Sequence, residues 1–273
     1  MRDGVTRKLI DSGMTLLDLE DNGVAHLTLN RPEAANGMSV PFLRSLYDAL
    51  MICHGEPALR VLVVSGAGAN FCAGGDIKDF ASKGEALPDY LREATSWLQI
   101  SVGALMRLNA PVIAAVHGFA AGGGGFGLVC AADLVVAAES AKFLPGATRA
   151  GMAPDAGVSV TLSRLIGLHR AMELVLLNPT LTAARAYEIG LVNKVVPDEE
   201  LHAAADELAT TLADGAPLAL AASKRLLWDG VGRSVEAALP DEARTVSELS
   251  GTADSREGLA AVIERRAPKF TGR

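Results

Sequence analysis

Cysteine and aromatic residues are scarce in this sequence. Aromatic side chains make up 4% of the 273 residues, and the three cysteines are Cys53, Cys72 and Cys130. An odd number of cysteines at such wide spacings forms neither a disulfide framework nor a zinc-ligand pattern. We therefore expect no metal site, and a reduced, cytoplasmic protein in which the cysteines are small core residues.

Positive charge and long apolar segments are lacking as well. The net charge of −7 argues against a nucleic-acid or membrane-surface partner. No apolar run reaches the about 18 residues that span a bilayer, and the first residues lack the basic and apolar segments of a secretion signal. What is present is an ordinary soluble composition, 49% hydrophobic and 21% charged, in a chain long enough for one large domain with or without a small appendage.

Strand patterns alternate with helical ones in the first half of the chain. After a polar lead-in over residues 1–13, which we expect to be mobile at its very end, two alternating runs within residues 15–29 flank Asn22-Gly23, a strong hairpin pattern. Ser39 precedes an amphipathic pattern that predicts a capped helix. Short apolar runs at 60–66, 111–118 and 133–139 predict strands buried on both faces, joined by parallel crossover connections.

From residue 80 onward the sequence patterns are mainly helical. Residues 80–89 have the composition of a mobile loop, and the pattern that follows predicts a helix from about Tyr90 to Leu108. Strand patterns end at Asp155, after which helical patterns separated by glycines continue along the chain. We therefore expect an α/β core over residues 1–195 and a helical region over residues 196–273.

The most unusual stretch is the run of four glycines from Gly122 to Gly125, between a predicted strand and a predicted helix. Glycine is costly to order, so such a run indicates close approach of the backbone to another group. The free N–H groups of a first helical turn favour negative charge, which makes this stretch a candidate anion or oxyanion site. A second glycine-rich turn, residues 65–77, could direct another N–H to the same oxygen. For either turn alone, the alternative is close packing of a strand on a helix.

Nucleotide-binding patterns fit these glycines poorly. Gly122, Gly124 and Gly127 match the spacing G-x-G-x-x-G, but the next acidic residues, Asp133 and Glu139, come earlier than the about 20 positions that a dinucleotide site requires. A phosphate-binding P-loop would need Gly-Lys-Ser/Thr after the turn, and the sequence has none there.

Four motifs in a fixed order carry a family resemblance. They are AGANFCAGGDIKDF (67–80), PVIAAVHGFAAGGGGFGL (111–128), AGMAPDAGVSVTLSRLIG (150–167) and EIGLVNKVVP (188–197). Together they resemble the successive motifs of the crotonase superfamily, the enoyl-CoA hydratases and isomerases. The likeness extends from about residue 15 to the end of the chain, and the order of several motifs makes it specific.

The resemblance implies a spiral of β-β-α units whose C-terminal helices assemble a homotrimer or a hexamer (a dimer of trimers). It implies an acyl-CoA thioester substrate, so that coenzyme A is part of the substrate and no cofactor is required. It also implies an oxyanion hole made by two backbone N–H groups, by motif position those of Gly75 and Gly124. One extra residue between Gly118 and Asp133 leaves Gly123 as the alternative second donor.

The same resemblance places Ala73, Asp76 and Ile77 against the adenine and pantetheine of coenzyme A. Arg265 or Lys269 would reach its phosphates.

The two catalytic glutamates of the family's hydratases are missing from this sequence. The first position is held by Phe126 or Gly127 and the second by Ala147, which can line a substrate site but cannot transfer a proton. Asp155 occupies a position where several relatives, two kinds of isomerase and a dehalogenase among them, carry an aspartate. Its alternative role is to cap the helix that follows.

The residues therefore favour an acyl-CoA isomerase over a hydratase. Asp155 would remove a proton near the thioester, Gly75 and Gly124 would stabilise the enolate, and the proton would return at another carbon. Two alternatives stay open. One is a hydratase-like activity that uses another acid such as Glu173, and the other is a protein that binds a coenzyme A ligand without turnover.

Overall fold

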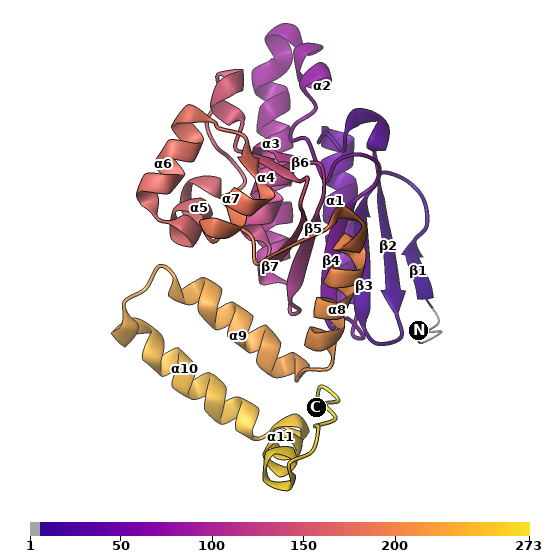
Figure 1. Cartoon of the computed structure of the whole chain (residues 1–273), viewed down its shortest axis with the longest axis vertical. Helices are drawn as coiled ribbons and strands as arrows, with labels where there is room; N and C mark the ends of the chain where they lie inside the picture. Colours follow the sequence, from indigo (N-terminus) through magenta and orange to yellow (C-terminus); the bar gives the residue numbers. More distant parts are fainter. Residues whose placement is uncertain (1–5) are drawn as a thin grey trace.

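A seven-stranded sheet forms the centre of the computed structural model, which describes residues 6–273 (Figure 1). The first three strands are antiparallel neighbours and every later pair is parallel. The predicted hairpin at Asn22-Gly23 and the predicted parallel crossovers are thus confirmed. In spatial order the strands are β1 (Thr6–Ile10), β2 (Thr15–Glu20), β3 (Val24–Leu29), β4 (Val61–Gly66), β5 (Val112–Val116), β7 (Leu134–Ala138) and β10 (Lys194–Val196).

A second sheet of three strands leads into the glycine run. It consists of β6 (Phe119–Ala121), β8 (Lys142–Leu144) and β9 (Leu181–Thr182). β6 continues directly into α4 (Gly122–Ala131), so the four glycines form the first turn of a helix. Cys72 pairs with this strand, since its N–H donates to Phe119 O (3.0 Å) and its carbonyl accepts from Ala121 N–H (2.9 Å). This pairing brings the two glycine-rich turns together.

Helices surround both sheets, which confirms the α/β class. α1 begins directly after Ser39, as predicted, although the serine side chain makes no capping hydrogen bond. α1 packs on α3, and α8 packs on the main sheet against β4, β5 and β7. The remaining helices are bounded as follows: α1 (Val40–Gly55), α2 (Ile77–Ala81), α3 (Leu87–Arg107), α5 (Val158–Ile166), α6 (Leu168–Leu177), α7 (Ala183–Glu188), α8 (Leu201–Ala213), α9 (Pro217–Gly230), α10 (Val235–Ser250) and α11 (Ala253–Glu264).

Three predictions of local structure are wrong. Part of the expected lead-in, Thr6–Ile10, is strand β1 and pairs with β2, while residues 1–5 of that prediction lie outside the described residues. The expected loop over 80–89 is largely helical, because it contains the end of α2, a 3-10 turn at Gly84–Ala86 and the start of α3. Strands also continue beyond Asp155, as β9 and β10. These two strands have two and three residues, too few for a periodic pattern.

A buried charge cluster attaches α9 to the core. Lys224 Nζ lies 2.8 Å from Asp133 Oδ2 and donates to the carbonyls of Leu105 and Ala110. Burial lowers the pKa of Lys224, and the Asp133 carboxylate opposes that shift. Trp228 Nε1–H donates to the other Asp133 oxygen at 2.8 Å. Beyond this anchor, α10 and α11 extend away from the sheets (Figure 1).

The C-terminal region is helical, as predicted. The predicted boundary at residue 195 falls within β10, which pairs with β7 of the core, and α8 also packs on the main sheet. Within residues 6–273, none of the helices combines the length and the apolar composition needed to cross a membrane.

Candidate active site

Both glycine-rich turns open onto one cavity of about 590 Å³. Its walls are contributed by α1, α2 and the turn that precedes it, α3, the first turn of α4 and the segment Leu144–Asp155. Arg149 and Asp155 are the ionisable side chains among its lining residues. The rest of the lining is glycine, alanine, threonine and large apolar side chains, so the cavity suits an uncharged, largely apolar ligand group.

Gly75 presents an unused backbone donor to this cavity. Met38 forms backbone hydrogen bonds with the residues on either side of Gly75. Its N–H donates to Gly74 O (2.8 Å), and its carbonyl accepts from Asp76 N–H (3.1 Å). The Gly75 N–H therefore points to the opposite side of the strand-like segment, where no acceptor occurs among residues 6–273. A Cβ at Gly75 would lie 2.4 Å from the ring of Phe80, so any larger residue here would have to displace that ring.

The first turn of α4 supplies further donors at the same cavity. The N–H groups of Gly122, Gly123 and Gly124 have no acceptor within the helix, because they belong to its first turn. Gly122 has a left-handed φ of +56°, and its Cα lies against Gly74, which brings the two turns together. The structure thus combines Gly75 with either predicted second donor, Gly123 or Gly124. The helix dipole adds positive potential at this point.

Side chains also pack tightly against these glycines. A Cβ on Gly123 would lie 1.7 Å from Asp155 Oδ1, and one on Gly124 would lie 2.9 Å from Met38 Sδ. The carboxyl group of Asp155 therefore sits directly on the backbone of the glycine run, beside the free N–H groups.

Asp155 is not the cap of the following helix. α5 begins at Val158, its N-cap residue is Gly157, and no side chain caps it. The Asp155 carboxyl group makes no hydrogen bond or ion pair with another side chain among the described residues, and it faces the cavity. Burial raises the pKa of Asp155, and its own backbone N–H partly opposes the rise. A carboxyl group that is partly desolvated and otherwise unpartnered is a typical general base.

The positions of the missing glutamates are occupied as follows. Ala147 lies in the 3-10 turn Ala147–Ala150 and lines the cavity. Phe126 is fully buried in the core and does not line the cavity, which does not support the predicted substrate contact. A Cβ on Gly127 would lie 2.5 Å from the Cβ of Ala156, so that position has no room for an acid. Asp155 is therefore the one carboxylate on the cavity wall within residues 6–273.

The remaining predicted residues divide into two groups. Ala73 and Ile77 line the cavity, and Ile77 is 62% exposed at its edge. Asp76 does not line it, because its carboxylate caps α2 through Asp79 N–H (3.0 Å) and pairs with Arg31 (2.7 Å). Glu173 is exposed on α6 and is also absent from the wall, so the structure gives no support to a second acid there. Arg265 and Lys269 lie outside the cavity lining as well.

Several wall residues were missed by sequence reasoning. Arg149 donates to the carbonyl of Asn178 and also lines the cavity. Phe80 fell inside the expected loop. One face of α3 contributes Leu91, Ala94 and Leu98, whose spacing of three and four residues marks an apolar helical face. That spacing is visible in the sequence, but the sequence does not show that this face borders a cavity.

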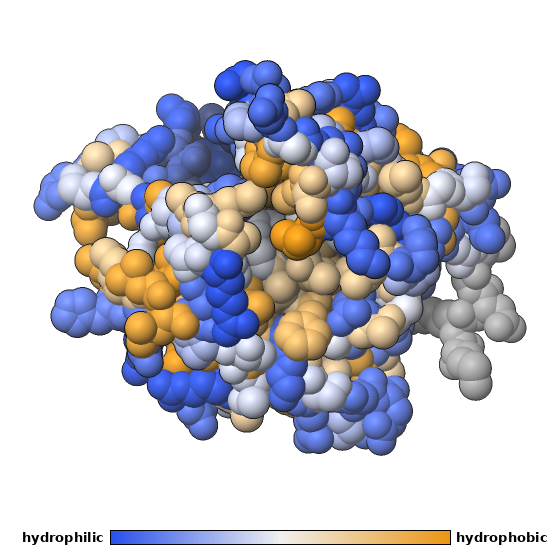
Figure 2. All heavy atoms as spheres, turned by 90° about the horizontal axis from the view of Figure 1, so that it is seen from above, coloured by the Kyte–Doolittle hydropathy of each residue, from blue (hydrophilic) through white to orange (hydrophobic). Residues whose placement is uncertain are grey.

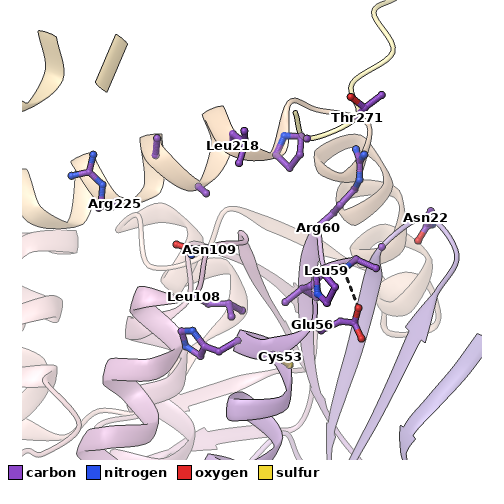
Figure 3. Close-up of a pocket in the computed structure, with 18 of the residues that line it drawn as sticks. Asn22, Cys53, Glu56, Leu59, Arg60, Leu108, Asn109, Leu218, Arg225 and Thr271 are labelled. Carbon is purple, nitrogen blue, oxygen red and sulfur yellow. Dashed lines mark hydrogen bonds between the residues drawn. The ribbon is translucent and has the colours of Figure 1, made fainter. Parts of the chain in front are cut away.

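A cavity of about 720 Å³ lies elsewhere, between α9 and the core (Figure 3). Its polar side chains serve structural contacts. Arg60 donates to the carbonyls of Ala213 and Phe270, Glu56 pairs with Arg7, and Arg225 pairs with Asp241. None of the predicted site residues lines it, and residues 6–273 contain no cluster of three or more acidic, histidine or cysteine side chains that could hold a metal ion.

Comparisons with known proteins identify the family of this chain. The family model described as enoyl-CoA hydratase/isomerase matches residues 20–273. A Rhodobacter capsulatus protein named "Probable enoyl-CoA hydratase" is 40% identical, over 92% of this chain and 95% of its own. The 1,2-epoxyphenylacetyl-CoA isomerase of Escherichia coli is 37% identical, over 94% and 98% respectively.

Solved structures show the same fold. The crystal structure of an enoyl-CoA hydratase from Bacillus anthracis superposes with a TM-score of 0.88 at 34% identity, and the match covers 97% of this chain and 99% of that one. The two sheets and the C-terminal helices thus belong to a known architecture. The chain is a member of the enoyl-CoA hydratase/isomerase family, the crotonase superfamily, and this membership implies an acyl-CoA substrate.

Proposed function

We propose that this protein is an acyl-CoA isomerase that moves a double bond or a proton within an enoyl-CoA. Asp155 acts as the single acid/base group, and the backbone N–H groups of Gly75 and Gly124, or Gly123 in place of Gly124, bind the thioester oxygen. The observation that carries this proposal is the position of the Asp155 carboxyl group, which faces the cavity against Gly123 and is the one carboxylate on its described wall.

The proposed chemistry needs one base and one oxyanion site. Asp155 takes a proton from a carbon made acidic by conjugation with the thioester, and the electron pair moves onto the thioester oxygen. Two fixed N–H donors stabilise this enolate, and removal of one such donor typically costs on the order of 10² to 10³ in rate. The protonated Asp155 then returns the same proton to another carbon, which shifts the double bond and regenerates the carboxylate.

The raised pKa of Asp155 suits both halves of this transfer. Burial makes the carboxylate a stronger base than an exposed aspartate, and it also makes the protonated form accessible for the return step. A hydration reaction would need, in addition, a second group to activate water. Ala147, Phe126 and Gly127, at the positions of the hydratase glutamates, supply none.

The family relationship alone supports both classes of reaction. Relatives of similar identity carry names of both kinds, such as the 1,2-epoxyphenylacetyl-CoA isomerase and the 2,3-dehydroadipyl-CoA hydratase of Escherichia coli. The residues on the cavity wall, and not overall similarity, therefore favour isomerisation. In this proposal Ala73 and Ile77 lie along the coenzyme A moiety, while Gly123 and Ala147 contact the acyl group.

We further propose a homotrimer or a hexamer, as the family resemblance implies. Exposed apolar side chains support an assembly. Leu176 and Leu177 of α6 are 66% and 74% exposed, and Val262 and Ile263 of α11 are 78% and 81% exposed. Apolar side chains also gather at the left edge of Figure 2, the side on which α5 and α6 lie. The cytoplasmic location belongs to the same proposal and is supported by three buried cysteines without a disulfide.

The test compares wild type with Asp155→Asn on 3-enoyl-CoA, 2,4- and 3,5-dienoyl-CoA and crotonyl-CoA. We expect double-bond shifts with wild type and a loss of about 10² to 10⁴ in rate for the variant. Glu173→Gln is the matched control and should retain full activity. Hydration of crotonyl-CoA that survives Asp155→Asn would contradict the isomerase proposal. An absence of all turnover, with coenzyme A thioesters still bound, would favour the binding protein instead.

A further inference from the structure

The Gly75 N–H is held between two segments that both depend on one tyrosine hydroxyl. Gly75 itself has no side chain, so the direction of its N–H is set by its neighbours. On one side lies Met38, which forms the two backbone bonds that flank Gly75. On the other side lies α2, which begins two residues after Gly75. Tyr90, near the start of α3, reaches both.

The first contact fixes the Met38 side. Val40 N–H, at the first position of α1, donates to the Tyr90 hydroxyl oxygen at 3.0 Å. Val40 is two residues from Met38, and the Ser39 side chain does not cap this helix. The tyrosine hydroxyl therefore replaces the missing cap and holds in place the start of α1, next to Met38, which is hydrogen-bonded to Gly74 and Asp76.

The second contact fixes the α2 side. The Tyr90 hydroxyl donates to the Asp79 carboxylate, and Lys83 Nζ lies 2.7 Å from the same group. Asp79 N–H in turn donates to Asp76 Oδ1, which caps α2 directly after Gly75. Burial disfavours the ionised Asp79, but the hydrogen bonds from Lys83 and Tyr90 outweigh it and hold the pKa of Asp79 below its usual value. The carboxylate is thus present at neutral pH to accept both bonds.

A third contact comes from aromatic packing. The Phe80 ring fills the space next to Gly75, where a Cβ would lie 2.4 Å from it. Phe80 meets the ring of Tyr90 edge-on, with centroids 6.1 Å apart. Lys83 Nζ lies over the face of the Tyr90 ring, 4.3 Å from its centroid, in a cation–π contact. One residue therefore connects α1, α2 and the ring that packs on Gly75.

We propose that Tyr90, acting through Asp79 and Val40, is a positioning residue that aims the Gly75 N–H at the thioester oxygen. Tyr90 and Asp79 do not line the cavity and do not touch the reacting atoms. This inference rests on the oxyanion role of Gly75 in the proposed function, and it does not depend on the role of Asp155.

The expected effect is a loss of rate without a loss of binding. Misplacement of a catalytic group by about 1 Å can cost on the order of 10² in rate. Because Tyr90→Phe keeps the ring and removes only the hydroxyl, we expect kcat to fall roughly 10- to 100-fold. KM should stay within about threefold, since the cavity wall is unchanged.

The experiment uses the full-length protein and two readouts. The first is kcat and KM for 3-enoyl-CoA isomerisation. The second is the ultraviolet absorption of bound 2,4-hexadienoyl-CoA, recorded by rapid mixing before its double bonds shift, because hydrogen bonds to the carbonyl of a conjugated thioester move its absorption to longer wavelength. We expect a smaller shift in Tyr90→Phe than in wild type. The shift in Asp79→Ala should be as small as in Tyr90→Phe, and Asp79→Asn should recover part of the wild-type shift. The double variant Tyr90→Phe/Asp79→Ala should show little further loss, since both residues act through one network.

Tyr187→Phe is the matched control, because that tyrosine is exposed on α7. A Tyr90→Phe variant that unfolds at a lower temperature but keeps the wild-type kcat and absorption shift would show a purely structural role and overturn the inference. A wild-type protein that shifts the dienoyl-CoA absorption but isomerises nothing would refute the proposed activity while leaving Tyr90 testable. Absence of any shift in wild type would refute the oxyanion role of Gly75, and the inference with it.

Discussion

A methyl group at Gly123 should disable the enzyme without unfolding it. Gly123 lies in the first turn of α4 with a backbone conformation that alanine adopts. Its Cβ would lie 1.7 Å from Asp155 Oδ1, whereas real contacts of this kind stay beyond about 3.0 Å. The carboxylate must therefore move by at least about 1.3 Å. A displacement on the order of 1 Å lowers the rate of a positioned reaction about 10²-fold.

The free energy of unfolding of Gly123→Ala should not fall with the rate. The Asp155 side chain can swing into the cavity, and alanine favours a helix over glycine by about 0.5–1 kcal/mol. We therefore expect Gly123→Ala to lower kcat for enoyl-CoA isomerisation about 10²-fold, while urea denaturation shows unchanged or slightly higher stability.

Gly103→Ala is the control for this comparison. Gly103 lies within α3, and a Cβ there meets nothing within 4 Å, so stability should rise with no loss of rate. A Gly123→Ala protein with the wild-type kcat would refute the placement of Asp155 as the base, because its carboxylate would tolerate a displacement that a general base cannot.

Four further predictions concern charge and assembly. Because burial raises the pKa of Asp155, the acid limb of kcat/KM should have its midpoint above 3.8 and should disappear in Asp155→Asn. A raised carboxyl pKa favours folding only at acidic pH and costs stability once pH rises through the folded-state value, so Asp155→Asn should melt at a higher temperature than wild type at pH 7. Lys224→Ala removes the ion-pair partner of Asp133 and the donor to two carbonyls, and we expect a loss of about 3 kcal/mol in urea denaturation. Ile263→Glu places charge on an 81% exposed apolar position of α11 and should reduce the mass measured by light scattering, whereas a mass already that of a monomer in wild type would contradict the proposed assembly.

Features set by local sequence could be predicted well. The Asn22-Gly23 hairpin and the buried strands β4, β5 and β7 follow from turn chemistry and apolar runs within a few residues. The start of α3 was missed, although Pro88 in its first turn is a recognised helix-start residue. β10 was missed because three residues carry no period, and its strand conformation depends on pairing with β7, far away in the sequence.

The candidate site could be predicted only in part, for a related reason. Motif order identified Gly75, Gly124 and Asp155, which the fold brings to one cavity. Counting along the chain could not show that Phe126 points into the core, since the direction of a helical side chain depends on what the helix packs against. Nor could composition show that Asp79, in a polar stretch, is bonded to Tyr90 and Lys83. Those contacts depend on the tertiary arrangement of α2 and α3.

The contact between Gly127 and Ala156 limits how this active site can evolve. Ala156 adopts a left-handed backbone with φ +52°, and its methyl group occupies the space that a side chain at position 127 would need. A single Gly127→Glu change would push on Ala156 and therefore on the neighbouring Asp155. An acid at position 127 therefore needs a second substitution that makes room at position 156, because the first change alone displaces the existing base.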